Sequence, residues 1–285
     1  MVSPKILRRR IRSVQSTAKI TRAMEMIATA KMKKAQDMAI AGRPYSDKIM
    51  HVIADLSAQA AAGGAVHPLL VARPVNKIGI VHITTDRGLC GGLNTNLNRL
   101  VGNFILDQKV PVTVITVGSK GRDFMRRSMR ETRAEFTKLG DRPKMADTMA
   151  ISQIVIDDYT RGLYDRVYIA YSRFVNLMSQ KPTLELILPV EPAQLPKSVS
   201  PEYIFEPNAM HVLGELLPRF VEMQVYHSIL ESIASEQSAR MMAMRNATEN
   251  AHDVIAELTL TLNKARQEMI TKDLLDIVAG VEGLK

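Results

Sequence analysis

Two long apolar seams, one near each end of the chain, limit its possible folds more than any other feature. Apolar or small residues recur at alternating spacings of three and four from residue 7 to residue 42, and again from 213 to 269. Most lysines and arginines of the first segment lie off its seam. This spacing is typical of coiled-coil helices rather than ordinary globular helices. The polar exceptions on the two seams are Thr21, Glu25, His227, Gln237 and Thr248.

Prolines and glycines set the expected bounds of these helices. Pro4 suits the first turn of the N-terminal helix, the pair Gly63-Gly64 ends it, and Pro44 predicts a kink within it. In the C-terminal segment Pro218 predicts a bend or a helix start. At a rise of 1.5 Å per residue the two rods would reach about 80 Å and about 100 Å, so their lengths differ.

The last turns of the C-terminal seam have no partner in the sequence. After Met269 the next two seam positions hold Lys272 and Asp276. The apolar residues there nearly encircle the helix, and they are Ile270, Leu274, Leu275, Ile277, Val278 and Val281. A helix that is apolar most of the way round must be buried by something. We therefore expect this tip to be enclosed by other subunits.

The segment between the two rods has a different pattern. Strands are predicted at residues 77–84, 112–118, 165–172 and 183–189, with helices near 95–108, 120–128 and 145–160. This alternation predicts an α/β layer with a partly parallel sheet, and residues 190–208 read as a loop with four prolines. The fold class is therefore α plus α/β. Residues 1–60 and 208–285 form an antiparallel two-helix coiled coil, and residues 75–200 form an inserted Rossmann-like domain.

The charge is concentrated at one end. The net charge is +9, and residues 1–50 account for all of it, with 12 basic residues against three acidic ones. This predicts an acidic partner for that segment, which could be nucleic acid, a membrane surface or an acidic protein. An organelle transit peptide ranks second, because the seam continues past residue 40. No apolar stretch approaches the roughly 20 residues that span a bilayer, so a soluble or peripheral protein is expected.

A glycine turn invites comparison with a phosphate-binding loop. Residues 84–97 read TTDRGLCGGLNTNL, yet Gly88, Gly91 and Gly92 fit neither the dinucleotide fingerprint nor a P-loop. The six histidines form no zinc motif, and the single Cys90 excludes an internal disulfide. Asp86 beside Arg87 is interpreted as an ion pair. We therefore expect a tight strand-to-helix turn and no catalytic, metal or cofactor site.

Three blocks of the chain resemble the γ-subunit family of F-type ATP synthases. They are residues 10–36, 84–97 and 235–280, and the match runs almost end to end. It departs mildly at Asp273, where the family usually has Glu, and at Val281, where Ala is common. No cysteine-bearing regulatory insert of the chloroplast type is present, which argues against thiol control.

The resemblance implies a non-catalytic rotor shaft inside a ring of α and β subunits. The shaft would turn with the membrane c-ring, contact the ε subunit, and drive each β subunit through its nucleotide states. It would bind neither nucleic acid nor a small-molecule substrate. The location implied is peripheral, on the cytoplasmic face of the bacterial inner membrane.

The same resemblance carries three groups of partner contacts over to this chain. The N-terminal helix contributes Lys19, Arg22, Met24, Lys31, Lys33 and Lys34. The glycine turn contributes Arg87, Leu89, Cys90 and Gly91. The C-terminal helix contributes Arg240, Arg266, Gln267, Thr271, Leu274 and Ile277. Each charged residue could instead belong to a solvated face that contributes little energy.

Two other functions compete with the rotor hypothesis. A basic coiled coil could track nucleic-acid phosphates, although its basic segment lacks aromatic residues that would stack on bases. A dinucleotide-dependent enzyme would use the α/β alternation, although the phosphate-binding motif is missing.

Overall fold

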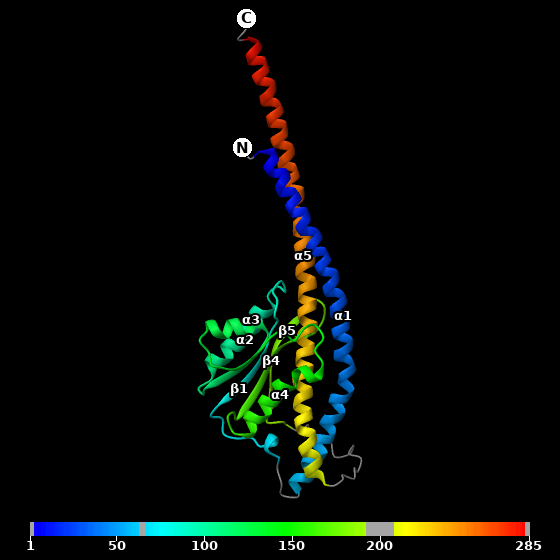
Figure 1. Ribbon diagram of the computed structural model, residues 1–285, viewed down its shortest axis with the longest axis vertical. Helices are drawn as coiled ribbons and strands as arrows, with labels where there is room; N and C mark the ends of the chain where they lie inside the picture. The colour runs from blue at the N-terminus through cyan, green and yellow to red at the C-terminus, as the bar shows by residue number, and fades with distance from the viewer. Residues whose placement is uncertain (1–2, 63–66, 192–207, 283–285) are drawn as a thin grey trace. The chain divides into compact units, whose positions relative to one another are not determined.

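The computed structural model describes residues 3–62, 67–191 and 208–282. Its two longest elements are helix α1 (Pro4–Ala62) and helix α5 (Ala209–Glu282) (Figure 1). The chain divides into two compact units. One combines residues 1–28 with 240–285, and the other comprises residues 29–239.

The ends of the two long helices test the proline and glycine signals. Helix α1 begins at Pro4 and ends at Ala62, directly before the glycine pair, as predicted. It is helical throughout, including Pro44. Helix α5 begins at Ala209 and has Pro218 within it, so a helix start at Pro218 is wrong. A proline in a helix removes one backbone donor, and the packing of the flanking Leu217 and Phe220 offsets that loss.

The larger unit contains a five-stranded sheet. Its strands are β1 (Ile78–Ile83), β2 (Val112–Val117), β3 (Thr132–Phe136), β4 (Arg166–Phe174) and β5 (Gln180–Leu188). The spatial order is β3-β2-β1-β4-β5, and only the β4–β5 pair is antiparallel. Helices α2 (Leu93–Asp107), α3 (Ser119–Arg127) and α4 (Met145–Thr160) connect the parallel strands, and the short helix η1 (Pro68–Leu70) precedes β1. The partly parallel Rossmann-like sheet is thereby confirmed, whereas the edge strand β3 was not predicted.

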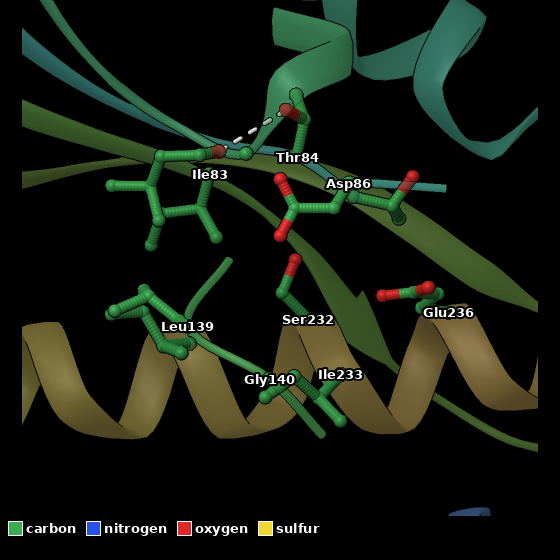
Figure 2. Close-up of a pocket in the computed structure, with 12 residues that line it drawn as sticks. Ile83, Thr84, Asp86, Leu139, Gly140, Ser232, Ile233 and Glu236 are labelled. Carbon is green, nitrogen blue, oxygen red and sulfur yellow. Dashed lines mark hydrogen bonds between the residues drawn. The ribbon is translucent and has the colours of Figure 1, made fainter. Parts of the chain in front are cut away.

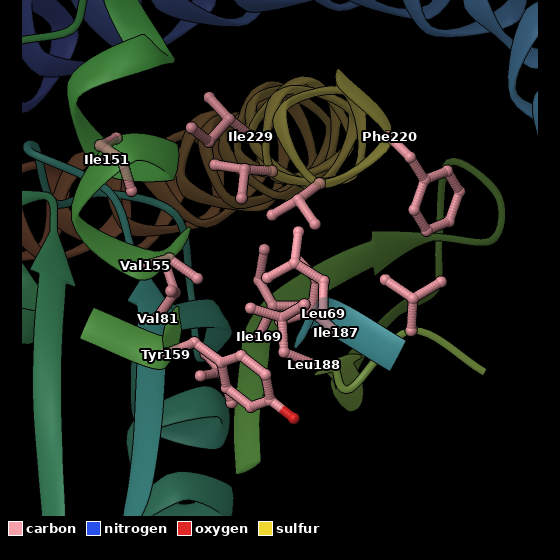
Figure 3. Packing of buried hydrophobic residues seen from close by; sticks show 14 of the residues in the cluster. Leu69, Val81, Ile151, Val155, Tyr159, Ile169, Ile187, Leu188, Phe220 and Ile229 are labelled. Atoms are coloured by element: carbon pink, nitrogen blue, oxygen red, sulfur yellow. The ribbon is translucent and has the colours of Figure 1, made fainter. Parts of the chain in front are cut away.

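Both faces of this sheet are covered. On one face, residues such as Ile80 of β1 pack with Leu97 of α2 and Met125 of α3. On the other face, Val81 of β1 shares a cluster with Val155 of α4 and Ile229 of α5 (Figure 3). All six residues of β1 are buried, which is the pattern of a central parallel strand. Helix α5 is therefore one of the covers of the sheet.

The smaller unit pairs the start of α1 with the second half of α5. Its buried positions are Leu7, Ala18, Thr21, Ala28, Arg240, Met244, Thr248 and Ala251, and all of them except Arg240 lie on the predicted seams. Two of the polar exceptions meet, because the hydroxyl groups of Thr21 and Thr248 lie 2.6 Å apart. A buried polar pair of this kind fixes the register of two helices. The antiparallel coiled coil is thus confirmed.

The final turns of α5 remain uncovered. Every described residue from 266 to 278 is exposed, apart from Asp276, whose side chain lies outside the description. The exposed fraction reaches 58% at Leu274 and 64% at Leu275. None of the described helices is long and apolar enough to span a membrane. The predicted loop at 190–208 lies almost wholly outside the described residues.

Candidate partner interface

The glycine turn after β1 is held in shape by Asn94, in the first turn of α2. The side-chain oxygen of Asn94 accepts the backbone N–H of Thr85 at 3.2 Å. Its amide nitrogen donates to the hydroxyl of Thr85 at 2.8 Å and to Sγ of Cys90 at 3.3 Å. Leu89 and Gly91 adopt left-handed backbone conformations, with φ of 63° and 57°. The turn is therefore a rigid, tightly bonded strand-to-helix connection, as the glycines predicted.

The carboxylate of Asp86 bridges three loops at the same end of the sheet. One oxygen accepts the backbone N–H of Ser119 at 2.9 Å and the hydroxyl of Ser119 at 2.8 Å. The other oxygen accepts the backbone N–H of Lys138 at 2.8 Å. The ion pair expected between Asp86 and Arg87 is thus replaced by these bonds. The reason is geometric, because the N-terminal amide of α3 and the loop after β3 both point at the carboxylate.

The chain's own atoms therefore occupy the position where a phosphate-binding loop would hold its ligand. Besides the bonds to Asp86, the backbone N–H of Gly121 donates to the hydroxyl of Thr84 at 2.7 Å. Figure 2 shows Asp86 opposite Ser232 of α5 and Gly140 beside Ile233 of the same helix; all four residues line a cavity of about 40 Å³.

A more open cavity of about 480 Å³ lies beside Asp86. Its lining includes two cations, Arg87 and Lys138, and three acids, Asp86, Asp141 and Glu236. The acids outnumber the cations, so this lining does not favour a phosphate group.

Three of the four predicted contacts on the glycine turn lie at the surface. Arg87 and Gly91 are exposed, and Leu89 has 62% of its surface exposed. Cys90 differs, because only 2% of it is exposed and its sulfur lies under Asn94. The partner contact of Cys90 stays a prediction. The apolar thiol packs inward, where free cysteines usually lie.

The N-terminal group of predicted contacts is mostly accessible. Lys19 and Arg22 of the smaller unit are exposed, as are Lys33 and Lys34 of the larger unit, and Met24 is half-buried. Lys31 is already engaged within the chain, because its Nζ lies 2.6 Å from Oδ2 of Asp141.

The C-terminal group separates into one buried residue and five exposed ones. Arg266, Gln267, Thr271, Leu274 and Ile277 are exposed. The hydroxyl of Thr271 donates to the backbone oxygen of Gln267 at 3.0 Å, a bond within the helix. Arg240 is only 8% exposed. The partner contact of Arg240 stays a prediction.

Sequence reasoning missed two features of this region. Asp141 received no role, although it binds Lys31 and also accepts a bond from Gln237. Gln237 was noted only as a polar exception on the seam, which was the available signal. His82 of β1 was set aside with the other histidines, yet it is fully buried, and burial lowers its pKa to about 4. Within the described residues, no group of three or more His, Cys, Asp or Glu could hold a metal ion.

Comparisons with known proteins give the family. The model of the family described as ATP synthase matches residues 3–284. The chain is 60% identical to the ATP synthase gamma chain of Dehalococcoides mccartyi over the full length of both chains. It belongs to the ATP synthase gamma chain family. The gamma chain of Roseiflexus sp. is 47% identical, with 100% of this chain and 99% of the relative covered.

Solved structures agree with this membership. The central stalk of the Tetrahymena thermophila mitochondrial ATP synthase is 25% identical, with a TM-score of 0.61, and the match covers 80% of this chain and 99% of that one. A chain of the Euglena gracilis mitochondrial ATP synthase shares the fold, with 20% identity, a TM-score of 0.67 and coverage of 99% and 94%. This gamma chain is thus a rotor subunit of the central stalk of an ATP synthase. The resemblance noted in the sequence is confirmed, and a nucleic-acid-binding role is not favoured.

Proposed function

We propose that the tip of α5 turns within a sleeve made by the α and β subunits of the ATP synthase ring. The observation that carries this proposal is the exposure of Ile270, Leu274, Leu275 and Ile277, each between 49% and 64%. Apolar surface of this extent on one helix gains free energy only when another protein covers it. The end of α5, residues 270–282, is the part of the rotor that the ring would enclose.

We further propose how the remaining surfaces are used. Lys19, Arg22, Lys33 and Lys34 face acidic segments of β, and Arg266 with Gln267 hydrogen-bonds a loop of β. Arg87 and Leu89 on the glycine turn form a second contact. The exposure of these side chains supports the assignment, because an accessible charge can reach a partner. Residues 1–60 with 208–285 act as the shaft, and residues 75–200 act as the head that meets the ε subunit and the c-ring.

The chain is proposed to be non-catalytic and to act at the cytoplasmic face of the bacterial inner membrane. Support for the absence of nucleotide chemistry comes from Asp86, whose carboxylate uses the amides of Ser119 and Lys138. Isothermal titration of the purified chain with ATP and with NAD is expected to release no binding heat. A saturable, stoichiometric binding curve for either ligand would contradict this part of the proposal.

The decisive experiment changes the tip alone. In an ATP synthase reconstituted with this chain, the double substitution Leu274→Ser and Ile277→Ser should weaken co-purification with the ring and reduce proton-driven ATP synthesis. Leu106→Ser is the matched control, because Leu106 is 71% exposed on α2 of the α/β unit. Wild-type assembly and synthesis in the tip variant would rule out a bearing role for these residues.

A further inference from the structure

Asp141 joins the α/β domain to both long helices. It lies in the connection between β3 and α4. Its Oδ2 lies 2.6 Å from Nζ of Lys31 on α1, and its Oδ1 accepts a bond of 3.3 Å from the side-chain amide of Gln237 on α5. The two oxygens of one carboxylate thus engage two different helices, and all three residues belong to the larger unit.

The burial of Gln237 is explained by this contact. Gln237 occupies an apolar seam position and is only 1% exposed. A buried amide without a partner would cost free energy, so its bond to Asp141 is needed to keep it on the seam. At 3.3 Å this bond is longer than most charge-assisted hydrogen bonds, and its contribution is to give the buried amide an acceptor.

Stability alone does not account for this arrangement. The side chains of Lys31 and Asp141 are 36% and 42% exposed, and ion pairs as exposed as this contribute little to folding. The contacts of Asp141 differ from apolar packing in that their strength depends on the angle between donor and acceptor. Hydrogen bonds weaken steeply when the donor or the acceptor turns away, whereas apolar contacts have no preferred angle. Asp141 therefore resists sliding and twisting of the helices against the domain more than it adds to the folding free energy.

Other hydrogen bonds fasten the sheet to α5. The hydroxyl of Ser235 donates to the backbone oxygen of Ser172 at 2.8 Å, and that of Ser238 donates to the backbone oxygen of Leu177 at 2.8 Å. These two bonds end on strand β4 and on the hairpin that follows it. Neither of these two bonds involves α1, whereas Asp141 also contacts α1 through Lys31.

We propose that Asp141 is a positioning residue that locks the α/β domain to both helices, so that torque passes between the domain and the shaft. The inference rests on the rotor role established above. It also gives Lys31 an internal purpose: its ammonium group holds Asp141 and is not a contact for β, unlike the exposed Lys33 and Lys34.

A charge exchange in the reconstituted ATP synthase tests this assignment. The variants are Asp141→Asn, Lys31→Met and the exchange of both charges, Lys31→Asp with Asp141→Lys. Gln237 carries both a donor and an acceptor, so its amide can serve either orientation of the pair. Lys33→Met is the matched control, because it removes a nearby exposed charge.

The readout is the angular fluctuation of a probe that is fixed to the α/β domain. It is recorded while rotation of the shaft within the ring of α and β subunits is stalled. Each single substitution should widen this fluctuation and reduce ATP synthesis against a load by about two- to fivefold, the range expected from an exposed ion pair. The exchange should restore both quantities, and the melting temperature should change little.

Two results would overturn the proposal. One is wild-type fluctuation and synthesis in Asp141→Asn, with a loss in Lys31→Met that the exchange does not repair, because Lys31 would then act on a partner. The other is a fall in melting temperature without any change in fluctuation, because Asp141 would then be only structural. In either case the rotor assignment stands, since the tip variants test it separately.

Discussion

The two units of the chain bury different kinds of side chain. In the larger unit, residues 29–239, which is called the α/β unit here, large residues such as Val155, Tyr159 and Leu217 are completely buried. In the smaller unit, which pairs residues 1–28 with 240–285 and is called the helix-pair unit, the buried positions are mostly small or polar, as Ala18, Thr21 and Ala251 show. The first unit therefore makes its own core, whereas the second makes a narrow seam and leaves its apolar tip uncovered. The difference teaches that the chain gains most of its stability in the larger unit, and that burial of the tip contributes nothing to it.

The largest expected effect compares a core leucine with a tip leucine. Leu217→Ala should lower the free energy of unfolding of the isolated chain by about 4 kcal/mol, because a fully buried side chain leaves a cavity. Leu274→Ala should change it by less than about 0.5 kcal/mol, because that side chain is already in water. Urea denaturation measures both. Equal losses would break the comparison, since the tip would then be part of a core.

A pH titration tests how completely the α/β unit excludes water. Burial lowers the pKa of His82 from 6.5 to about 4, so the unfolded chain binds the extra proton first as the pH falls. Stability should therefore be full above pH 6.5 and should fall by about 3 kcal/mol in all between pH 6.5 and 4. Below pH 4 this group has no further effect.

The variant His82→Leu should flatten that pH dependence, as followed by denaturation at several pH values. His252→Leu is the control, because it removes an exposed histidine from the helix-pair unit. An unchanged slope in His82→Leu would mean that other groups govern the acid sensitivity.

Alanine substitutions at two glycines of the α/β unit distinguish the cost of backbone strain from the cost of steric crowding. Gly118 and Gly140 both have positive φ, of 95° and 81°, so alanine strains the backbone at either position. A Cβ on Gly118 would also overlap the carbonyl oxygen of Thr84, whereas one on Gly140 meets nothing within 4 Å. Gly118→Ala should therefore cost about 2 kcal/mol more than Gly140→Ala in thermal denaturation. Equal losses of stability in the two variants would show that the backbone around Thr84 can move away from the added Cβ at little cost.

The smallest effect concerns the seam of the helix-pair unit. Thr21→Val should lower stability by about 1 kcal/mol, because the hydroxyl of Thr248 loses a buried partner. The double variant with Thr248→Val should regain most of that loss, because both polar groups are then gone. A thermal melt followed by circular dichroism compares the variants. A double variant with the summed loss of both single ones would argue against coupling across the seam.

The elements were predictable to different degrees, for physical reasons. The long helices follow from the seam because a heptad spacing has one dominant structural solution. Strand β3 was missed because its sequence, TRAEF, has one β-branched residue and two charges, and its pairing with β2 supplies what the local pattern lacks.

The site was predictable only at the level of accessible charge. The exposure of Arg22 and Arg266 follows from their positions off the seam. The burial of Cys90 and the bonds of Asp86 depend on segments brought together by the fold, since Asp86 reaches Ser119 across 33 residues and Lys138 across 52. Asp141 lies 110 residues from Lys31, so a pattern in one stretch of sequence cannot indicate their contact.

The pairing of Thr21 with Thr248 spans 227 residues, which has a consequence for biosynthesis. The first 28 residues leave the ribosome early, and their helical partner leaves it among the last. The helix pair cannot form until both segments have been made, whereas most of the α/β domain between them can fold earlier. The two-helix part of the fold is therefore completed only after the domain that interrupts it in the sequence.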